Sequence, residues 1–164
     1  MLEWLAHQNN QTIRQSSNIE FRQSSNQAIK QSSNQLMQLK ALPSASLSSG
    51  ELKLYAYPDN MPDTPVGCVE LYNYDPVNRR AAVGLVVSNE YRRQGYGSAM
   101  IQALTQFCLN STSLHQVYAD IAATNIPSLH IFQRAGYQHC ATLRDWVVRS
   151  NHFIDTYRYQ LILN

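Results

Sequence analysis

A continuous apolar run, a loop with two glycines and an amphipathic segment follow one another between residues 81 and 108. Together they restrict the fold more than any other part of the chain. Residues 81–87 are apolar throughout, which is typical of a strand buried in the middle of a sheet. After the loop, apolar residues return at helical spacing and form one stripe: Met100, Ile101, Leu104, Phe107 and Cys108. The segment therefore predicts a central strand, a tight turn, and a helix that opens at Ser98.

Shorter patterns on both sides predict further strands and a second helix. We expect strands at 52–56, 66–74, 117–121, 137–143 and 154–162, with a hairpin turn at 75–78. A short helix is expected at 127–135, because Pro127 suits its first turn and Gly136 its end. These elements predict a single α+β or α/β domain with a mixed, largely antiparallel sheet.

The first fifty residues follow a different pattern. The motif Arg14-Gln-Ser-Ser-Asn18 recurs eight residues later from Arg22, and again from Lys30. Eight residues turn a helix by about 800°, so each repeat drifts roughly 80° and a straight helix keeps no single apolar face. We therefore expect residues 1–50 to be a low-complexity Gln-, Ser- and Asn-rich segment, partly helical or partly disordered. The folded domain is expected over residues 51–164.

Charge and cysteine content exclude several classes of protein. The formal net charge of +2 is too small and scattered to indicate a nucleic-acid partner. Cys68, Cys108 and Cys140 lie far apart without CxxC spacing, which argues against a zinc site or a disulfide framework and predicts no bound metal. No apolar run reaches the length of a membrane span, and residues 1–10 do not resemble a signal peptide. A soluble cytoplasmic protein with no membrane partner is expected.

The loop Arg92-Arg93-Gln94-Gly95-Tyr96-Gly97-Ser98 is suited to binding a pyrophosphate. Two glycines one residue apart let successive amides turn inward, and the next helix adds the positive end of its dipole. A dinucleotide fingerprint needs a third glycine where Met100 stands, and a P-loop needs a lysine directly before Ser98. Neither motif fits. An ordinary strand-to-helix turn remains the alternative.

A second segment gives the loop its context. It is Asn125-Ile-Pro-Ser128-Leu-His-Ile-Phe132-Gln-Arg-Ala-Gly136-Tyr137. The loop followed by this segment resembles the two cofactor segments of the GNAT N-acetyltransferase superfamily, and the resemblance covers residues 52–163. The stretch from Pro65 to Leu71, with the ending from Trp146 to Tyr159, is similar to the spermidine, diamine and ribosomal-protein acetyltransferases.

The resemblance implies a GNAT-like three-layer fold, in which helices flank a twisted sheet and acetyl-CoA lies in a V-shaped splay between two central strands. Main-chain groups of Leu85, Val86 and Val87 would then pair with the pantetheine arm. The amides of Arg92, Arg93, Gln94, Gly95, Tyr96, Gly97 and Ser98 would hold the pyrophosphate. Asn125 and Ser128 would contact the cofactor from the second strand, and Phe132 would flank its thiol end.

The implied reaction is acetyl transfer from acetyl-CoA to a primary amine of a polyamine, a diamine or a peptide N-terminus. An alkylamine is protonated at neutral pH, so a base must remove a proton, and Glu70 is the candidate because a carboxylate in an apolar strand is costly unless used or paired. Alternatively, Glu70 faces solvent or pairs with Arg79 or Arg80. Phe132 stands where the family has a tyrosine that protonates the departing thiolate.

Other features leave the acceptor open. In the family the first fifty residues cover the acceptor site, yet here they hold only Glu3 and Glu20 as acids, and Asn73 replaces an acidic residue of the spermidine enzymes. Trp4 resembles a tryptophan that follows the first strand of the family, so that strand is expected to be missing. A non-catalytic acyl-CoA-binding or regulatory protein, and a nucleotide-binding protein, are the alternatives. A homodimer through the C-terminal strands is a further expectation.

Overall fold

The computed structural model describes residues 37–41 and 47–163, and within them the chain forms one seven-stranded sheet with the order β1-β2-β3-β4-β5-β7-β6. The strands are β1 (Met37–Ala41), β2 (Leu52–Pro58), β3 (Gly67–Asp75), β4 (Arg80–Val87), β5 (Gln116–Ala122), β6 (Gln138–Arg149) and β7 (His152–Ile162). Short 3-10 turns lie at Leu47–Ser49 (η1) and Asn89–Tyr91 (η2). All neighbours pair antiparallel except β4 and β5, which run parallel. The predicted mixed, largely antiparallel sheet is confirmed.

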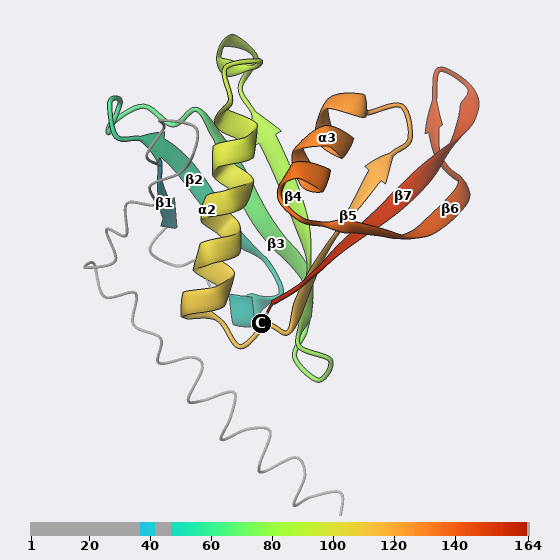
Figure 1. The fold of residues 1–164 in the computed structure, drawn as a ribbon, viewed down its shortest axis with the longest axis horizontal. Coiled ribbons are helices and arrows are strands. Elements are labelled where there is room, and N and C mark those ends of the chain that lie inside the picture. Colours follow the sequence, from blue (N-terminus) through green and yellow to red (C-terminus); the bar gives the residue numbers. More distant parts are fainter. Residues whose placement is uncertain (1–36, 42–46, 164) are drawn as a thin grey trace, which may run out of the picture.

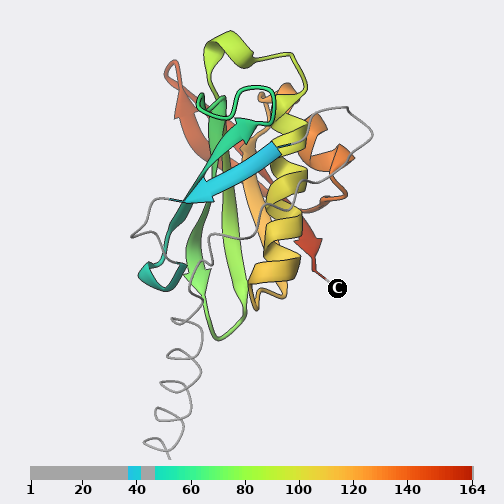
Figure 2. The same ribbon diagram turned by 90° about the vertical axis from the view of Figure 1, so that its left-hand side faces the viewer.

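Two helices, α2 (Tyr96–Ser111) and α3 (Ile126–Arg134), lie on the same face of this sheet (Figures 1 and 2). The predicted stripe of α2 is its buried side, with Phe107 only partly buried, and the helix opens at Tyr96, two residues earlier than expected. Alternate strand residues complete the core, among them Leu54, Val69 and Leu71. The intervening residues project to the opposite side, which we call the far face.

The sheet begins before residue 51, where the folded domain was expected to start. Strand β1 pairs with β2 in a register that sets Leu39 opposite Ala56, and Met37 is 3% exposed in the core. The eight-residue repeat had placed Met37 in the low-complexity segment. Residues 1–36 lie outside the described residues, so the expectations for the repeats, Trp4, Glu3 and Glu20 are not addressed by the structure.

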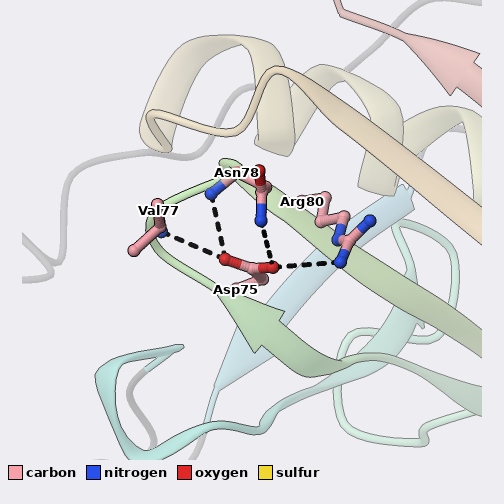
Figure 3. A network of polar contacts seen from close by, with 4 residues as sticks. All are labelled: Asp75, Val77, Asn78 and Arg80. Atoms are coloured by element: carbon pink, nitrogen blue, oxygen red, sulfur yellow. Dashed lines mark hydrogen bonds and ion pairs between the residues drawn. The ribbon is translucent and has the colours of Figure 1, made fainter.

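The turn between β3 and β4 is built around Asp75 (Figure 3). Its Oδ1 accepts hydrogen bonds from the amides of Val77 (3.1 Å) and Asn78 (2.9 Å), and its Oδ2 accepts from Asn78 Nδ2 (2.7 Å) and pairs with Arg80 (3.1 Å). The β3 register shifts just before this turn, where Asn73 has a φ of 50°. Asparagine tolerates that left-handed conformation better than most residues, so the backbone conformation explains why an asparagine stands at position 73.

The Asp75 turn predicts a pH-dependent contribution to stability. Hydrogen bonds from Asn78, and then the nearby Arg80, lower the pKa of Asp75 below its ordinary value. A carboxyl with a lowered folded pKa stabilises the fold above its unfolded pKa, near 3.9, and this contribution disappears as pH falls through the folded pKa. Asp75→Ala should therefore melt below the wild type at pH 7, and the gap should narrow as the pH is lowered from 7 to 3.

Thermal melts followed by circular dichroism at both pH values measure the gap. Asp63→Ala, in an exposed loop, is the control and should melt like the wild type at both pH values. A gap between Asp75→Ala and the wild type that is equally large at pH 7 and pH 3 would contradict this role of the Asp75 carboxylate.

Candidate functional site

The central feature of the site is the point where β4 and β5 stop pairing. Within the described residues, the two strands pair at Arg80–Gln116, Ala81–Val117 and Ala82–Tyr118 only. Strand β4 nevertheless runs on to Val87 and β5 to Ala122, and Figure 1 shows the two strands diverging from their meeting point. This divergence is the V-shaped splay that the sequence resemblance implies.

The pairing of β4 with β3 determines which main-chain groups face the splay. In an antiparallel pair only alternate residues exchange N–H···O=C bonds, and the Ser88 amide donates to the Val66 carbonyl at 3.0 Å. Counting back along β4, Val86 lies in a bonded pair with β3, whereas Leu85 and Val87 direct their main-chain groups toward the β5 side. The Val87 carbonyl accepts from Arg92 Nε at 3.1 Å. The main chain of Leu85 therefore faces the splay.

The loop from Arg92 to Ser98 has the tight curl predicted for it. Arg93 and Gly95 both have positive φ, 60° and 88°. Gly95 is the N-cap of α2 and provides no side-chain hydrogen bond to the first turn, so the amides that open α2 are not capped by it. The loop is braced by Gln94 Nε2, which donates to the Glu90 carbonyl at 2.8 Å. Amides at an uncapped helix start, preceded by a left-handed residue, form a ready anion site.

Gly97 lies where α2, α3 and the outer half of β4 come together. A Cβ added there would lie 2.8 Å from Ile131 Cδ1, and 3.6 and 3.7 Å from side-chain carbons of Val87 and Leu85. The absence of a side chain at Gly97 therefore lets the start of α2 approach both α3 and the splay. The two segments that resemble the cofactor segments of the GNAT superfamily meet at this point.

Helix α3 begins with a cap and buries Leu129 and Phe132 in the core. Asn125 is its N-cap, and its Oδ1 accepts from the Ser128 amide at 3.4 Å. Phe132 is 3% exposed and packs edge-on against Tyr137, with ring centroids 5.0 Å apart. Burial raises the pKa of the Tyr137 hydroxyl, which makes it a poor acid. His130 is exposed on this helix.

Glu70 lies on the far face of the sheet, in register with Lys53 on one side and Gly84 on the other. Its carboxylate pairs with Lys53 Nζ at 3.3 Å, and its side chain remains 31% exposed. The alternative partners are engaged elsewhere: Arg80 pairs with Asp75, and Arg79 Nε donates to the Ser113 carbonyl. Glu70 therefore has a cationic partner, but not the arginine partner that the sequence left open.

Sequence reasoning overlooked three residues on the far face of β5 and β7. Asp120 accepts two hydrogen bonds from Arg158, from Nε and Nη2, each 2.7 Å long. The Arg158 guanidinium also lies 4.6 Å from the ring centroid of Tyr118. The period-two alternation of Tyr118 and Asp120 between buried residues could have placed both on one face.

The described residues give no sign of a metal site or a membrane segment. They contain no group of three or more His, Cys, Asp or Glu side chains placed to hold a metal ion. Nor does this part of the chain include a helix that is long and apolar enough to cross a bilayer.

Comparison with known proteins agrees with the fold. The model of the acetyltransferase (GNAT) family matches residues 12–137, and the chain belongs to this family. It is 24% identical over 100 residues to the uncharacterized N-acetyltransferase YnaD of Bacillus subtilis, covering 61% of this chain and 58% of that protein. It is 22% identical over 72 residues to the spermidine N(1)-acetyltransferase of Vibrio cholerae, covering 44% of this chain and 42% of the enzyme.

A solved structure has the same fold. The spermidine N-acetyltransferase from Vibrio cholerae in complex with CoA and spermine superposes with a TM-score of 0.70 at 15% identity, covering 77% of this chain and 95% of that one. The chain spans about half the length of the curated relatives that it matches. The predicted fold and its resemblance to spermidine and ribosomal N-acetyltransferases are thus confirmed.

The geometry at Gly97 predicts the effect of a larger residue on acetyl-CoA binding. Gly97→Val places a branched side chain among Ile131, Val87 and Leu85, where it obstructs the splay beside the loop. The Kd for acetyl-CoA in calorimetry should rise about tenfold or more, equivalent to about 1.4 kcal/mol. Gly97→Ala is the matched control, because its Cβ comes too close only to the flexible end of Ile131 and makes ordinary contacts with Val87 and Leu85, so it should lose less affinity. Unchanged affinity in a folded Gly97→Val chain would show that this loop does not hold the cofactor.

Proposed function

We propose that this chain transfers the acetyl group of acetyl-CoA to a primary amine, carried by a polyamine, a diamine or a peptide N-terminus. The observation that supports this most is the end of β4–β5 pairing at Ala82, with the main chain of Leu85 directed into the splay beside the first turn of α2. A pantetheine arm contains amides that bond to such an edge as an added strand does. Its pyrophosphate suits the uncapped start of α2.

The directions of the main-chain groups indicate which residues would contact the cofactor. Leu85 and Val87 would pair with the pantetheine arm. The main chain of Val86 bonds to β3 instead, contrary to the expectation, so Val86 would contribute only through its side chain, which is 58% exposed. Residues 92–98 would hold the pyrophosphate through their amides. Asn125 uses its carbonyl oxygen to cap α3, so its amide nitrogen, with the Ser128 hydroxyl, is proposed to contact the cofactor.

The reaction is an acyl transfer whose protons can be followed. The amine arrives protonated, and Glu70 takes one proton, directly or through water, so that the nitrogen lone pair can attack the thioester carbonyl carbon. A C–N bond forms and the C–S bond breaks, which releases CoA as its thiolate, and the nitrogen gives up its second proton to water as it becomes the amide nitrogen. An amide of the β4 edge that donates to the carbonyl oxygen would stabilise the negative charge that develops there.

Thiolate departure is proposed to proceed without a tyrosine acid. Phe132 has no proton to give, and the buried Tyr137 hydroxyl holds its proton tightly. An alkyl thiol has a pKa of about 8.5, so its thiolate leaves readily and water can protonate it afterwards. We expect the absent acid to slow the reaction without abolishing it.

Two finer expectations remain predictions. A cytoplasmic location, where thiols stay reduced, is supported by Cys68, Cys108 and Cys140, all of which are free thiols in the structure. A homodimer through the C-terminal strands is supported by the hairpin of β6 and β7, whose edge carries exposed Trp146 and Phe153.

The role of Glu70 predicts a loss of turnover without a loss of cofactor. Glu70→Gln keeps the shape of the side chain but removes the proton acceptor, so kcat should fall by about 10²- to 10⁴-fold. The Kd for acetyl-CoA should stay nearly constant. CoA release in a thiol assay, with a panel of alkylamines, polyamines and peptides as acceptors, measures turnover.

Glu51→Gln is the matched control, because Glu51 also pairs with Lys53, at 3.7 Å, and is more exposed. It should retain near-normal turnover. Equal turnover of Glu70→Gln and wild type would move the base elsewhere. Tight acetyl-CoA binding by the wild type without CoA release for any acceptor would favour the alternative of a non-catalytic acyl-CoA-binding protein. The lack of a hydroxyl at Phe132 also supports that alternative.

A further inference from the structure

Four charged side chains and one glycine form a row across the far face of the sheet. The register of β2, β3 and β4 sets Lys53, Glu70 and Gly84 side by side. On the other side of the splay, Asp120 of β5 pairs with Arg158 of β7. Because Ala82 is the last β4 residue to pair, opposite Tyr118, Gly84 and Asp120 are the equivalent positions two residues further along each strand. Glu70 and Asp120 therefore flank Gly84 from opposite sides of the splay.

Alternation places this row on the face away from the helices. Val69, Leu71 and Val83 are buried in the core that α2 covers, as are Ala119 and Ile121 on β5. The residues between them point the other way, because successive side chains of a strand alternate. The row therefore lies on the far face of the sheet, whereas Gly97 and the loop 92–98 lie on the helix face.

Each carboxylate of the row is held by a cation on its outer side. Glu70 pairs with Lys53 at 3.3 Å, and Asp120 accepts the two-pronged contact of Arg158 at 2.7 Å. A bidentate arginine fixes both the position and the orientation of its carboxylate. Because the cations stand on β2 and β7, each carboxylate lies nearer to the splay than the cation that holds it.

The absence of a side chain at Gly84 makes room for Glu70. A Cβ at this position would lie 2.7 Å from Glu70 Cγ and 2.8 Å from its Oε1, so the Glu70 side chain lies over the glycine. Tyr72 lies in the neighbouring row, and burial, followed by the charges of Asp120 and Glu70, raises the pKa of its hydroxyl. Its hydroxyl thus lies within the electrostatic influence of both carboxylates.

The buried hydroxyl of Thr156 lies one far-face position from Arg158 along β7. Thr156 is 2% exposed, and its Oγ1 makes no hydrogen bond within residues 37–41 and 47–163. Thr156 is paired with Ala122 and precedes Arg158 by two residues, so it shares the far face with the charged row, toward the end of β5. A buried polar group without a protein partner is costly, and a bound water or a ligand is the kind of partner that completes it.

We propose that Asp120, held by Arg158, is a specificity-determining residue that binds the ammonium group of the acceptor across Gly84 from Glu70. The inference rests on the proposed acetyl transfer and names its substrate class as primary alkylammonium ions. Asp120 accepts a hydrogen bond from the ammonium while Glu70 takes the proton that must leave. Because Lys53 and Arg158 already balance both carboxylates, the row binds one ammonium through hydrogen-bond geometry rather than a polycation through net charge.

The test measures amine binding separately from turnover. NMR titration of the chain saturated with CoA gives the Kd for n-butylamine and for spermidine, and the thiol assay gives KM and kcat for the same amines. Asp120→Asn should raise the Kd and KM of both amines by about 10- to 100-fold, by the same factor, without changing the Kd of acetyl-CoA. Arg158→Lys keeps the charge but loses the bidentate contact, and it should cause a smaller rise. Asp63→Asn, in an exposed loop, is the control and should change none of these constants.

The outcomes separate this inference from the proposed function. Equal amine Kd values for the wild type and Asp120→Asn overturn the role of Asp120, whether or not the chain turns over. A fall in kcat with unchanged amine Kd also overturns it, as does a much larger loss for spermidine than for n-butylamine. Amine binding that depends on Asp120, without CoA release from acetyl-CoA by any acceptor, upholds the binding role and refutes the acetyl transfer.

Discussion

The end of pairing between β4 and β5 is the constraint on which the rest of the site depends. A strand in the middle of a sheet normally forms hydrogen bonds along both edges, and buried main-chain groups are rarely left unpaired. Here β4 pairs with β3 along its length but with β5 only as far as Ala82. The outer half of β4 therefore presents one row of main-chain donors and acceptors, with Leu85 at its centre. A ligand with its own amide groups is the natural partner for such an edge.

The divergence also divides the site between the two faces of the sheet. On the helix face, the absence of a side chain at Gly97 brings the start of α2 against α3 and the outer half of β4. On the far face, the absence of a side chain at Gly84 makes room for Glu70. One glycine thus serves the proposed cofactor and the other the proposed acceptor, and the thioester would lie between them, where a nucleophile on one face meets an activated carbonyl from the other.

The parts of this arrangement that the sequence predicted are those encoded over short distances. The stripe of α2, the curl around Gly95 and the Asp75 turn each depend on residues within a few positions of one another, so their patterns could be interpreted directly. Pairing across strands depends on register, which a single sequence does not reveal. For that reason Lys53 was not foreseen as the partner of Glu70, nor Arg158 as the partner of Asp120. Met37 was assigned to the repeats because it keeps their spacing, although it starts strand β1.

Residue-level hydrogen exchange of the β4 amides tests the central claim most directly. Leu85 N–H should exchange quickly in the free chain, because it faces the splay, while Gly84 and Val86 N–H should exchange slowly because they bond to β3. Saturation with acetyl-CoA should slow Leu85 strongly, together with the amides that open α2, and leave Gly84 and Val86 nearly unchanged. A Leu85 amide that is already protected in the free chain, or that stays fast when acetyl-CoA is bound, would contradict the account.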